Sequence, residues 1–194
     1  FDGASAATAA IELRNGGALT FAEGSTADAS TILVGRALSQ DELDALPEVT
    51  GLTKRDPSIA AKATFVGASL GNATIANGGT LAIAASNLHA STITNEASGT
   101  ATIGGRMLVV LDADGNPIVD SDDVPAPFML KSLGGAAKVT NHGTLKIQDT
   151  DLQDMALTNA AGNTSISASE GGHAIVANAD GATLSFTATQ LERM

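Results

Sequence analysis

The 194-residue sequence contains no cysteine, no tryptophan and no tyrosine, and five phenylalanines supply its aromatic content. The absence of cysteine excludes disulfides, thiolate chemistry and cysteine-ligated zinc. Most globular cores use large aromatic side chains, because each one buries a large area. A chain so poor in them is suited to a narrow interior that takes one small or medium side chain per position, as in a stacked repeat.

Basic residues are also scarce: 10 lysines and arginines stand against 21 acidic residues, which gives a net charge of −11. This balance disfavours nucleic acids and anionic membranes as partners, because both require basic patches. No stretch approaches the roughly 20 apolar residues of a membrane-spanning helix, so no membrane span is expected in this chain. The sequence begins Phe1-Asp2-Gly3 without an initiator methionine, and a removed secretion signal is therefore an open alternative.

Small residues dominate the composition, and in the last third of the chain they form a repeat. Three segments, 139–147, 157–166 and 175–186, share two short alternating strands around a corner that contains asparagine. The corner residues Asn141, Asn159 and Asn178 are 18 and 19 residues apart. A repeat this short, with an alternation of period two, predicts one coil of a β-solenoid per copy. We therefore predict an all-β, single-stranded β-helix of about seven coils of 18–19 residues, forming one domain over residues 1–194.

The same pattern, traced back along the chain, predicts columns of stacked side chains. One inward column comprises Ile75, Ile93, Val139, Leu157 and Ile175, and a second comprises Ile83, Ile103, Ile147, Ile166 and Phe186. A corner column comprises Asn15, Asn77, Asn95, Asn141, Asn159 and Asn178. Asparagine suits tight corners, and stacked side-chain amides bond to one another, so we interpret this column as a structural ladder and not as a binding site.

Two insertions interrupt the predicted stack, at about 35–58 and 104–136. The first carries a short helix signal, because Ser39 and Glu42 form a capping box and Pro47 ends the helical pattern. In the second, the apolar run 107–111 and the segment 117–119 flank an Asp-Gly-Asn turn, which predicts a β-hairpin. We expect any specific recognition to occur at these insertions or at the exposed ends of the stack.

Two groups of acidic residues are candidates for chemistry. Asp112, Asp114 and Asn116 gather side-chain oxygens within one short segment, so a weak calcium site is the alternative to a simple hairpin turn, although the EF-hand spacing is absent. The group 149, 151 and 154 contains three aspartates, and some solenoid enzymes cut polysaccharides with paired acids. Sugar clefts usually carry aromatic platforms, and the chain has no Trp or Tyr. We therefore predict no catalytic residue and no cofactor, with calcium as the one metal considered.

The unit Asn-x-Gly-Thr-Leu-x-Ile, present at 77–83 and 141–147, resembles the coils of bacterial secreted β-solenoids. The families concerned are two-partner-secretion adhesins of the filamentous haemagglutinin type and autotransporter passengers; the similar stretches are 11–21, 75–103 and 139–186. The resemblance implies an extracellular or cell-surface location and a non-enzymatic, structural or adhesive role. Open strand edges at the two ends of a solenoid predict self-association or binding to other surface proteins. The alternative is a carbohydrate-binding or polysaccharide-degrading solenoid of the phage tailspike or lyase kind.

Overall fold

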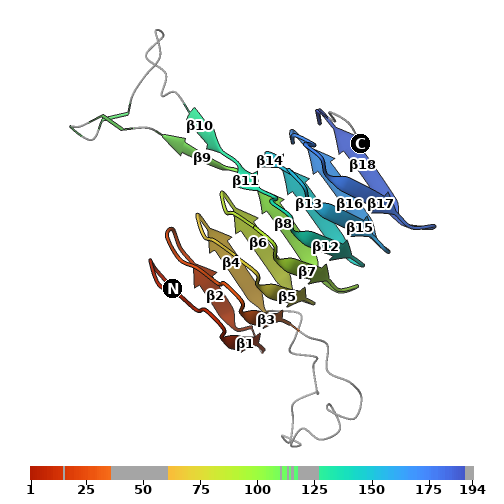
Figure 1. Cartoon of the computed structure of the whole chain (residues 1–194), viewed down its shortest axis with the longest axis horizontal. Helices are drawn as coiled ribbons and strands as arrows, with labels where there is room; N and C mark the ends of the chain where they lie inside the picture. Colours follow the sequence, from red (N-terminus) through yellow and green to blue (C-terminus); the bar gives the residue numbers. More distant parts are fainter. Residues whose placement is uncertain are drawn as a thin grey trace, which may run out of the picture.

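The computed structural model describes residues 1–14, 16–35, 61–109, 111, 112, 114, 116, 117 and 127–190. Over these residues every regular element is a β-strand, and the strands wind into a stack of coils (Figure 1). Each coil contributes one strand to each of two seven-stranded parallel sheets, so that consecutive strands alternate between the sheets. The predicted all-β, single-stranded β-helix is therefore confirmed.

The strands are short and pair in register from coil to coil. The first sheet contains β1 (Ala10–Leu13), β3 (Thr31–Val34), β5 (Thr74–Asn77), β7 (Thr92–Asn95), β12 (Lys138–Asn141), β15 (Ala156–Asn159) and β17 (Ile175–Asn178). The second contains β2 (Ala18–Phe21), β4 (Lys62–Val66), β6 (Thr80–Ala84), β8 (Thr100–Gly104), β13 (Thr144–Gln148), β16 (Asn163–Ser167) and β18 (Thr183–Thr187). Threonine, isoleucine and valine recur in them, because branched side chains pack well on a pleated surface.

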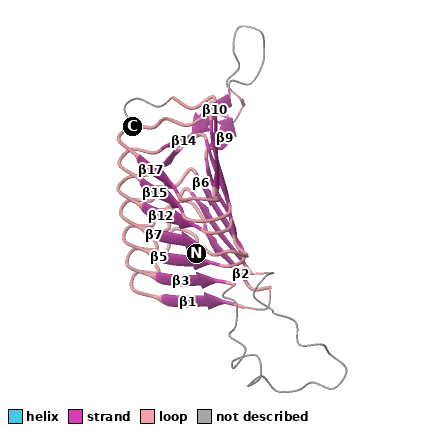
Figure 2. Ribbon diagram, turned by 90° about the vertical axis from the view of Figure 1, so that its right-hand side faces the viewer, coloured by secondary structure: helices cyan, strands magenta, loops and turns pink. Residues whose placement is uncertain are grey.

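A third, narrower face closes each coil. It consists of β11 (Ser132–Leu133), β14 (Thr150–Asp151) and single parallel bridges that join Ser5, Thr26, Ser69, Asn87, Leu133, Asp151, Glu170 and Gln190 in that order. Figure 2 shows the coils stacked along one axis, with the strands of successive coils side by side. One coil alone cannot bury its apolar side chains, so the stack forms through contacts between neighbours.

The interior is filled by columns of apolar side chains that point inward from the two sheets. The members that are at most 2% exposed include Ile32, Ile75, Ile93, Val139 and Leu157 from the first sheet, and Phe21, Phe65, Ile83, Ile103, Ile147 and Ile166 from the second. The rings of Phe1, Phe21 and Phe65 stack with centroids 4.7 and 4.9 Å apart. That is the spacing of neighbouring strands, about 4.8 Å, so like side chains meet along each column.

The prediction that Ile175 points inward is wrong. Strand β17 pairs with β15 so that Val176, and not Ile175, lies beside Leu157, and Ile175 is 70% exposed. The cause is one extra residue in the corner after Asn159, which shifts the following strands along the sequence by one position. Ile166 and Val176 are 10 residues apart in sequence, as are the inward residues Ile147 and Leu157.

The two insertions leave the stack at different corners. The first lies between β3 and β4, in the passage from the first sheet to the second; the predicted helix there is outside the described residues. The second follows β8, and the chain rejoins the stack at β11 on the third face. Its described part includes β9 (Arg106–Val109) and β10 (Pro127–Leu130), which project away from the stack (Figure 1).

The second insertion contains a β-hairpin of β9 and β10, whereas the predicted second segment, 117–119, lies outside the described residues except for Pro117. Strand β9 pairs antiparallel with β10, so that Val109 lies opposite Pro127 and Arg106 opposite Leu130. Within the described residues, the predicted turn closes an antiparallel bridge between Leu111 and Pro117.

Candidate functional site

Five asparagines form a hydrogen-bonded ladder at the corner between the two sheets. From Asn77 through Asn95, Asn141 and Asn159 to Asn178, each Nδ2 donates to the next Oδ1, at 2.7, 2.7, 2.9 and 2.7 Å. The same amides donate to backbone carbonyls of the next coil. Because the first four side chains are buried and bond to one another, they stabilise the corner and offer no open group to a ligand.

The ladder does not extend into the first two coils. The register places Leu13 and Val34 in the column where the later coils carry asparagine. The remaining predicted member, Asn15, lies outside the described residues. As a consequence Asn77 is the first rung, and its buried Oδ1 is one of two buried side-chain atoms in the described part that lack a hydrogen-bond partner.

A second polar column, which the sequence analysis missed, stabilises the corner between the second sheet and the third face. The Ser86 Oγ accepts the amide of Ala68 at 3.1 Å and donates to the carbonyl of Ala84 at 2.9 Å. The Ser132 Oγ accepts a hydrogen bond from the Ser86 amide and donates to the carbonyl of Gly104. In the same way, the Ser169 Oγ accepts from the Thr150 amide and donates to the carbonyl of Ser167. The signal was available: a hydroxyl residue stands three positions after Ile83, Ile147, Ile166 and Phe186.

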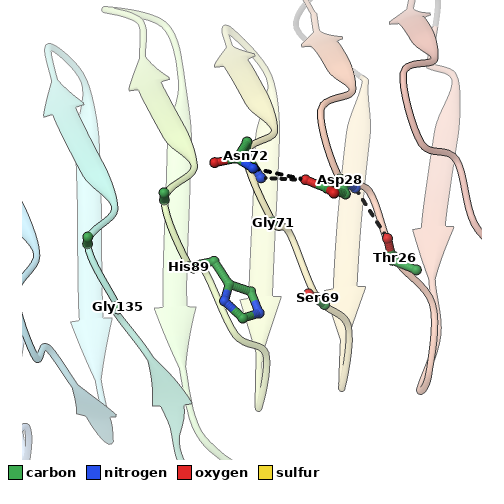
Figure 3. Close-up of a pocket in the computed structure, with 9 residues that line it drawn as sticks. Thr26, Asp28, Ser69, Gly71, Asn72, His89 and Gly135 are labelled. Atoms are coloured by element: carbon green, nitrogen blue, oxygen red, sulfur yellow. Dashed lines mark hydrogen bonds between the residues drawn. The ribbon is translucent and has the colours of Figure 1, made fainter.

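The third face carries a shallow groove of about 710 Å³ that runs across several coils (Figure 3). Its polar lining includes Thr26, Asp28, Ser69, Asn72 and His89. Small residues leave room for the groove: Gly71 and Gly135 occupy the turns on both sides of His89, and Ala90 and Ala136 also line it. Hydroxyl, amide, imidazole and carboxylate groups in an open groove can form hydrogen bonds with a polar ligand.

Asp28 is the best-fixed side chain in this groove. Its Oδ1 accepts the backbone N–H of Asn72 at 2.9 Å and the Asn72 side-chain amide at 3.3 Å (Figure 3). Gly71 makes this approach feasible, since a Cβ there would lie 2.3 Å from that Oδ1. The Asn72 backbone hydrogen bond, more than any other influence, lowers the pKa of Asp28. Asp28 therefore links the second and third coils, on either side of the first insertion.

The predicted calcium residues lie together in the turn of the second insertion. The Asp112 Oδ1 accepts the backbone amides of Asp114 and Asn116, both at 2.9 Å, and the Asp112 amide donates to the Asn116 carbonyl. These bonds are typical of an Asx-stabilised turn. In the described part of the chain, no group of three or more His, Cys, Asp or Glu residues could hold a metal ion. Calcium binding here stays a prediction.

Two of the three aspartates at 149–154 contact separate partners. Asp149 lies in the left-handed region, with φ of 49°, and Asp151 accepts the backbone N–H of Gln153 at 3.2 Å. Asp154 lies 3.5 Å from Nδ1 of His173 in the next coil. Beside them, Glu170 pairs with Lys131. Asp151 thus bonds within its own turn, and Asp154 lies beside the turn of the next coil.

Comparison with known proteins gives no family for this chain. No protein-family model matches the sequence, and no curated protein matches it significantly. Among the described residues, no helix is long and apolar enough to cross a membrane. The class of protein that the fold defines is a β-solenoid with an asparagine ladder.

Proposed function

We propose that this chain is a non-enzymatic structural or adhesive subunit of an extracellular or bacterial cell-surface assembly, and that its coils stack end to end on further copies. What supports the proposal is the last coil. Strands β17 and β18 each stand at the end of their sheet and, within the described part of the chain, have a partner strand on one side. Phe186, which belongs to an inward column, is 37% exposed there, whereas the corresponding Ile166 is 1% exposed.

Two further features favour another coil as the partner of this end. Among the described residues, the amide of Asn178 donates within its own coil, to the Ala182 carbonyl at 2.9 Å, whereas the amides of the four earlier ladder residues also donate to the next coil. At the opposite end, Phe1 stacks on Phe21 and remains 48% exposed. Head-to-tail stacking would place Phe186 of one copy against Phe1 of the next. Such a contact repeats without closing, and it produces filaments.

Sedimentation velocity and negative-stain electron microscopy of the full chain test end-to-end stacking. We expect the mass to rise with concentration and short rods to appear. Phe186→Lys places a charge in the column and should abolish both effects, because an inward-facing charge blocks strand-edge pairing. Ile175→Lys is the matched control, since Ile175 is also exposed on the last coil but points away from the interior. Equal masses for the wild type and Phe186→Lys at every concentration would contradict the proposal.

The surface location rests on the resemblance of the coils to secreted solenoids. It is tested by labelling intact cells of the organism that makes the protein with antibodies raised against the purified chain. Labelling of intact cells is expected, and labelling only after the cells are broken would exclude a surface role. Adhesion is tested on the same cells, as attachment of beads coated with the purified chain.

The third-face groove supports a second candidate, binding of a carbohydrate. Asp28, Ser69 and His89 supply the hydrogen-bonding groups for this role, and a glycan array probes it directly. His89→Gly is the informative variant, because His89 has a φ of 49° and glycine accepts that conformation while removing the imidazole. An array without hits for the wild-type chain would remove this candidate.

A further inference from the structure

The third-face groove holds a fixed carboxylate without a basic side chain beside it. Among the residues that the structure describes, no lysine or arginine lines the groove. The Asp28 carboxylate is held by two hydrogen bonds from Asn72. The pKa of Asp28 lies below its usual value, chiefly because of the Asn72 backbone N–H, so the carboxylate is ionised at neutral pH. The groove therefore offers a negative charge to a cationic group of a ligand.

Uncharged hydrogen-bonding groups follow Asp28 along the groove. The Thr26 Oγ1 accepts the Asp28 backbone N–H at 3.3 Å, and its own proton remains able to donate. Ser69 and His89 come from the two following coils, and the His89 side chain extends over the groove (Figure 3). These groups can bond to hydroxyls of a ligand whose cationic group lies on Asp28.

A neutral sugar gains little from this set of groups. Sugar clefts usually carry aromatic platforms, but the chain has no Trp or Tyr, and no phenylalanine is among the described residues that line the groove. A neutral hydrogen bond contributes about 1 kcal/mol net, because water supplies the same bond, whereas a bond to a charged group contributes about 1.5–3 kcal/mol. A sugar that places an ammonium on Asp28 therefore gains more than a neutral one.

The groove follows the axis of the stack. Its lining passes from Thr26 to Ser69, His89 and Gly135, one coil at a time. Neighbouring coils are about 4.8 Å apart, which is close to the spacing of the rings in an extended sugar chain. Small residues such as Gly135 and Ala136 leave room for the rings between the polar groups. The groove thus suits a linear chain that lies along the axis.

A second exposed carboxylate stands on the third face beyond the groove. Asp154 occupies the turn position that Ala136 occupies one coil earlier, because each lies three residues after the paired Leu133 and Asp151. The Asp154 side chain is 70% exposed. Four coils separate it from Asp28, or about 19 Å along the axis. A chain of several rings can reach from one carboxylate to the other.

We infer that the third-face groove binds a linear oligomer of an amino sugar, whose rings follow the axis and whose protonated amines lie on Asp28 and Asp154. This inference rests on the carbohydrate-binding candidate proposed above and names the class of its ligand. The net charge of −11 attracts a cationic chain and opposes the approach of an acidic glycan.

Calorimetric titration of the full chain at neutral pH tests the amine. The probes are a hexamer of β-1,4-linked glucosamine and the fully N-acetylated hexamer, which has the same linkage and length but no charge. We expect the glucosamine hexamer to bind at least about tenfold more tightly. Equal affinities would overturn the inference and leave the broader carbohydrate candidate in place. No binding of the glucosamine hexamer would also overturn it, and the glycan array would then decide the broader candidate separately.

Two variants assign the binding to this groove. Asp28→Asn keeps an acceptor oxygen and removes the charge, so it should weaken binding of the glucosamine hexamer by at least about tenfold. Its control, Asp180→Asn, makes the same charge change on a distant turn and should have no effect. Ala136→Lys adds a cation to the groove without altering the Asp28 hydrogen bonds and should also weaken binding, whereas Ala161→Lys, at an exposed corner, should not. Unchanged affinity in Asp28→Asn and Ala136→Lys would exclude the groove.

Oligomer length and ring structure test the rest of the assignment. A glucosamine trimer is too short to join Asp28 and Asp154, so Asp154→Asn should weaken binding of the hexamer and leave the trimer unchanged. An equal effect on both oligomers would overturn the axial arrangement. Spermine presents amines on a chain without rings and should bind less tightly than the hexamer. Equal or tighter binding of spermine would mean that the groove selects charge alone, which would overturn the sugar as ligand.

Discussion

The side-chain amide of Asn95 donates a hydrogen bond to Oδ1 of Asn141 at 2.7 Å, although 46 residues separate the two in sequence. The distance equals that between Asn77 and Asn95, which are 18 residues apart in uninterrupted coils. The second insertion therefore leaves the ladder intact. A solenoid accepts such a loop at a corner because the strands on either side still meet their neighbours in register, and loops are where such folds carry specific contacts.

We expect Asn141→Ala to lower the free energy of unfolding by about 2 kcal/mol or more, because buried amide and carbonyl groups of two neighbouring coils lose partners. The Asn141 side chain accepts from Asn95 and Gly143 and donates to Asn159 and Asn163. Urea denaturation followed by circular dichroism measures the change. The matched control is Asn178→Ala, in the exposed last rung, which should cost less than half as much. Equal costs at the two positions would contradict a cooperative ladder.

The first rung allows a stabilising interaction to be added. Asn77 Oδ1 is buried without a partner, and Val34 lies directly beside Asn77 in the preceding coil. Val34→Asn would supply an amide donor at the position that the ladder repeats, so we expect a change within about 1 kcal/mol of zero. The same substitution at the buried Val139 has no ladder to join and should cost about 3 kcal/mol or more. Thermal denaturation of both variants makes the comparison.

An acid-sensitivity prediction follows from Asp28. The Asn72 backbone hydrogen bond holds the pKa of Asp28 below its ordinary value of 3.8. A carboxyl whose pKa is lower in the folded chain stabilises the fold above its unfolded pKa, and this contribution is lost as the pH falls through the folded pKa. Asp28→Asn keeps an acceptor oxygen but cannot titrate. We expect its melting temperature to fall less than that of the wild type between neutral pH and pH values below 3.8. Asp180→Asn, on an exposed turn, should behave like the wild type.

Much of the fold was predictable because the repeat is short and its period is regular. The columns through Ile83 and Ile147 and the asparagine ladder follow from spacing alone, since each coil must place like residues beside like. The error at Ile175 arose where two apolar residues, 175 and 176, stand side by side, so that alternation does not choose between them. The separation of 10 residues between inward positions does distinguish them: counted from Ile166, it identifies Val176 as the inward residue.

Other features depend on contacts that sequence spacing does not encode. The partner of β9 begins at Pro127, beyond residues 118–126, whereas local turn chemistry favoured the nearer segment 117–119. The groove around Asp28 forms because three turns from separate coils place Gly71 and Gly135 beside His89, which becomes visible only when the coils are stacked. The left-handed conformations of Ala85, Ala168 and Ala188 were also hidden, because alanine seldom adopts them.

Those alanines supply the last prediction. Ala85 has a φ of 48° at the corner after β6, and Gly67 has a φ of 62° at the same corner of the preceding coil. A left-handed conformation costs an L-residue about 1–2 kcal/mol, whereas glycine adopts it without steric cost but loses more chain entropy on folding. The first effect is the larger, so Ala85→Gly should raise the free energy of unfolding by up to about 1 kcal/mol. Ala84→Gly, one residue earlier and inside β6, removes a side chain from a regular strand and should lower it by a similar amount. Urea denaturation of the two variants side by side tests the argument, because a general effect of glycine on the unfolded chain would shift both in the same direction.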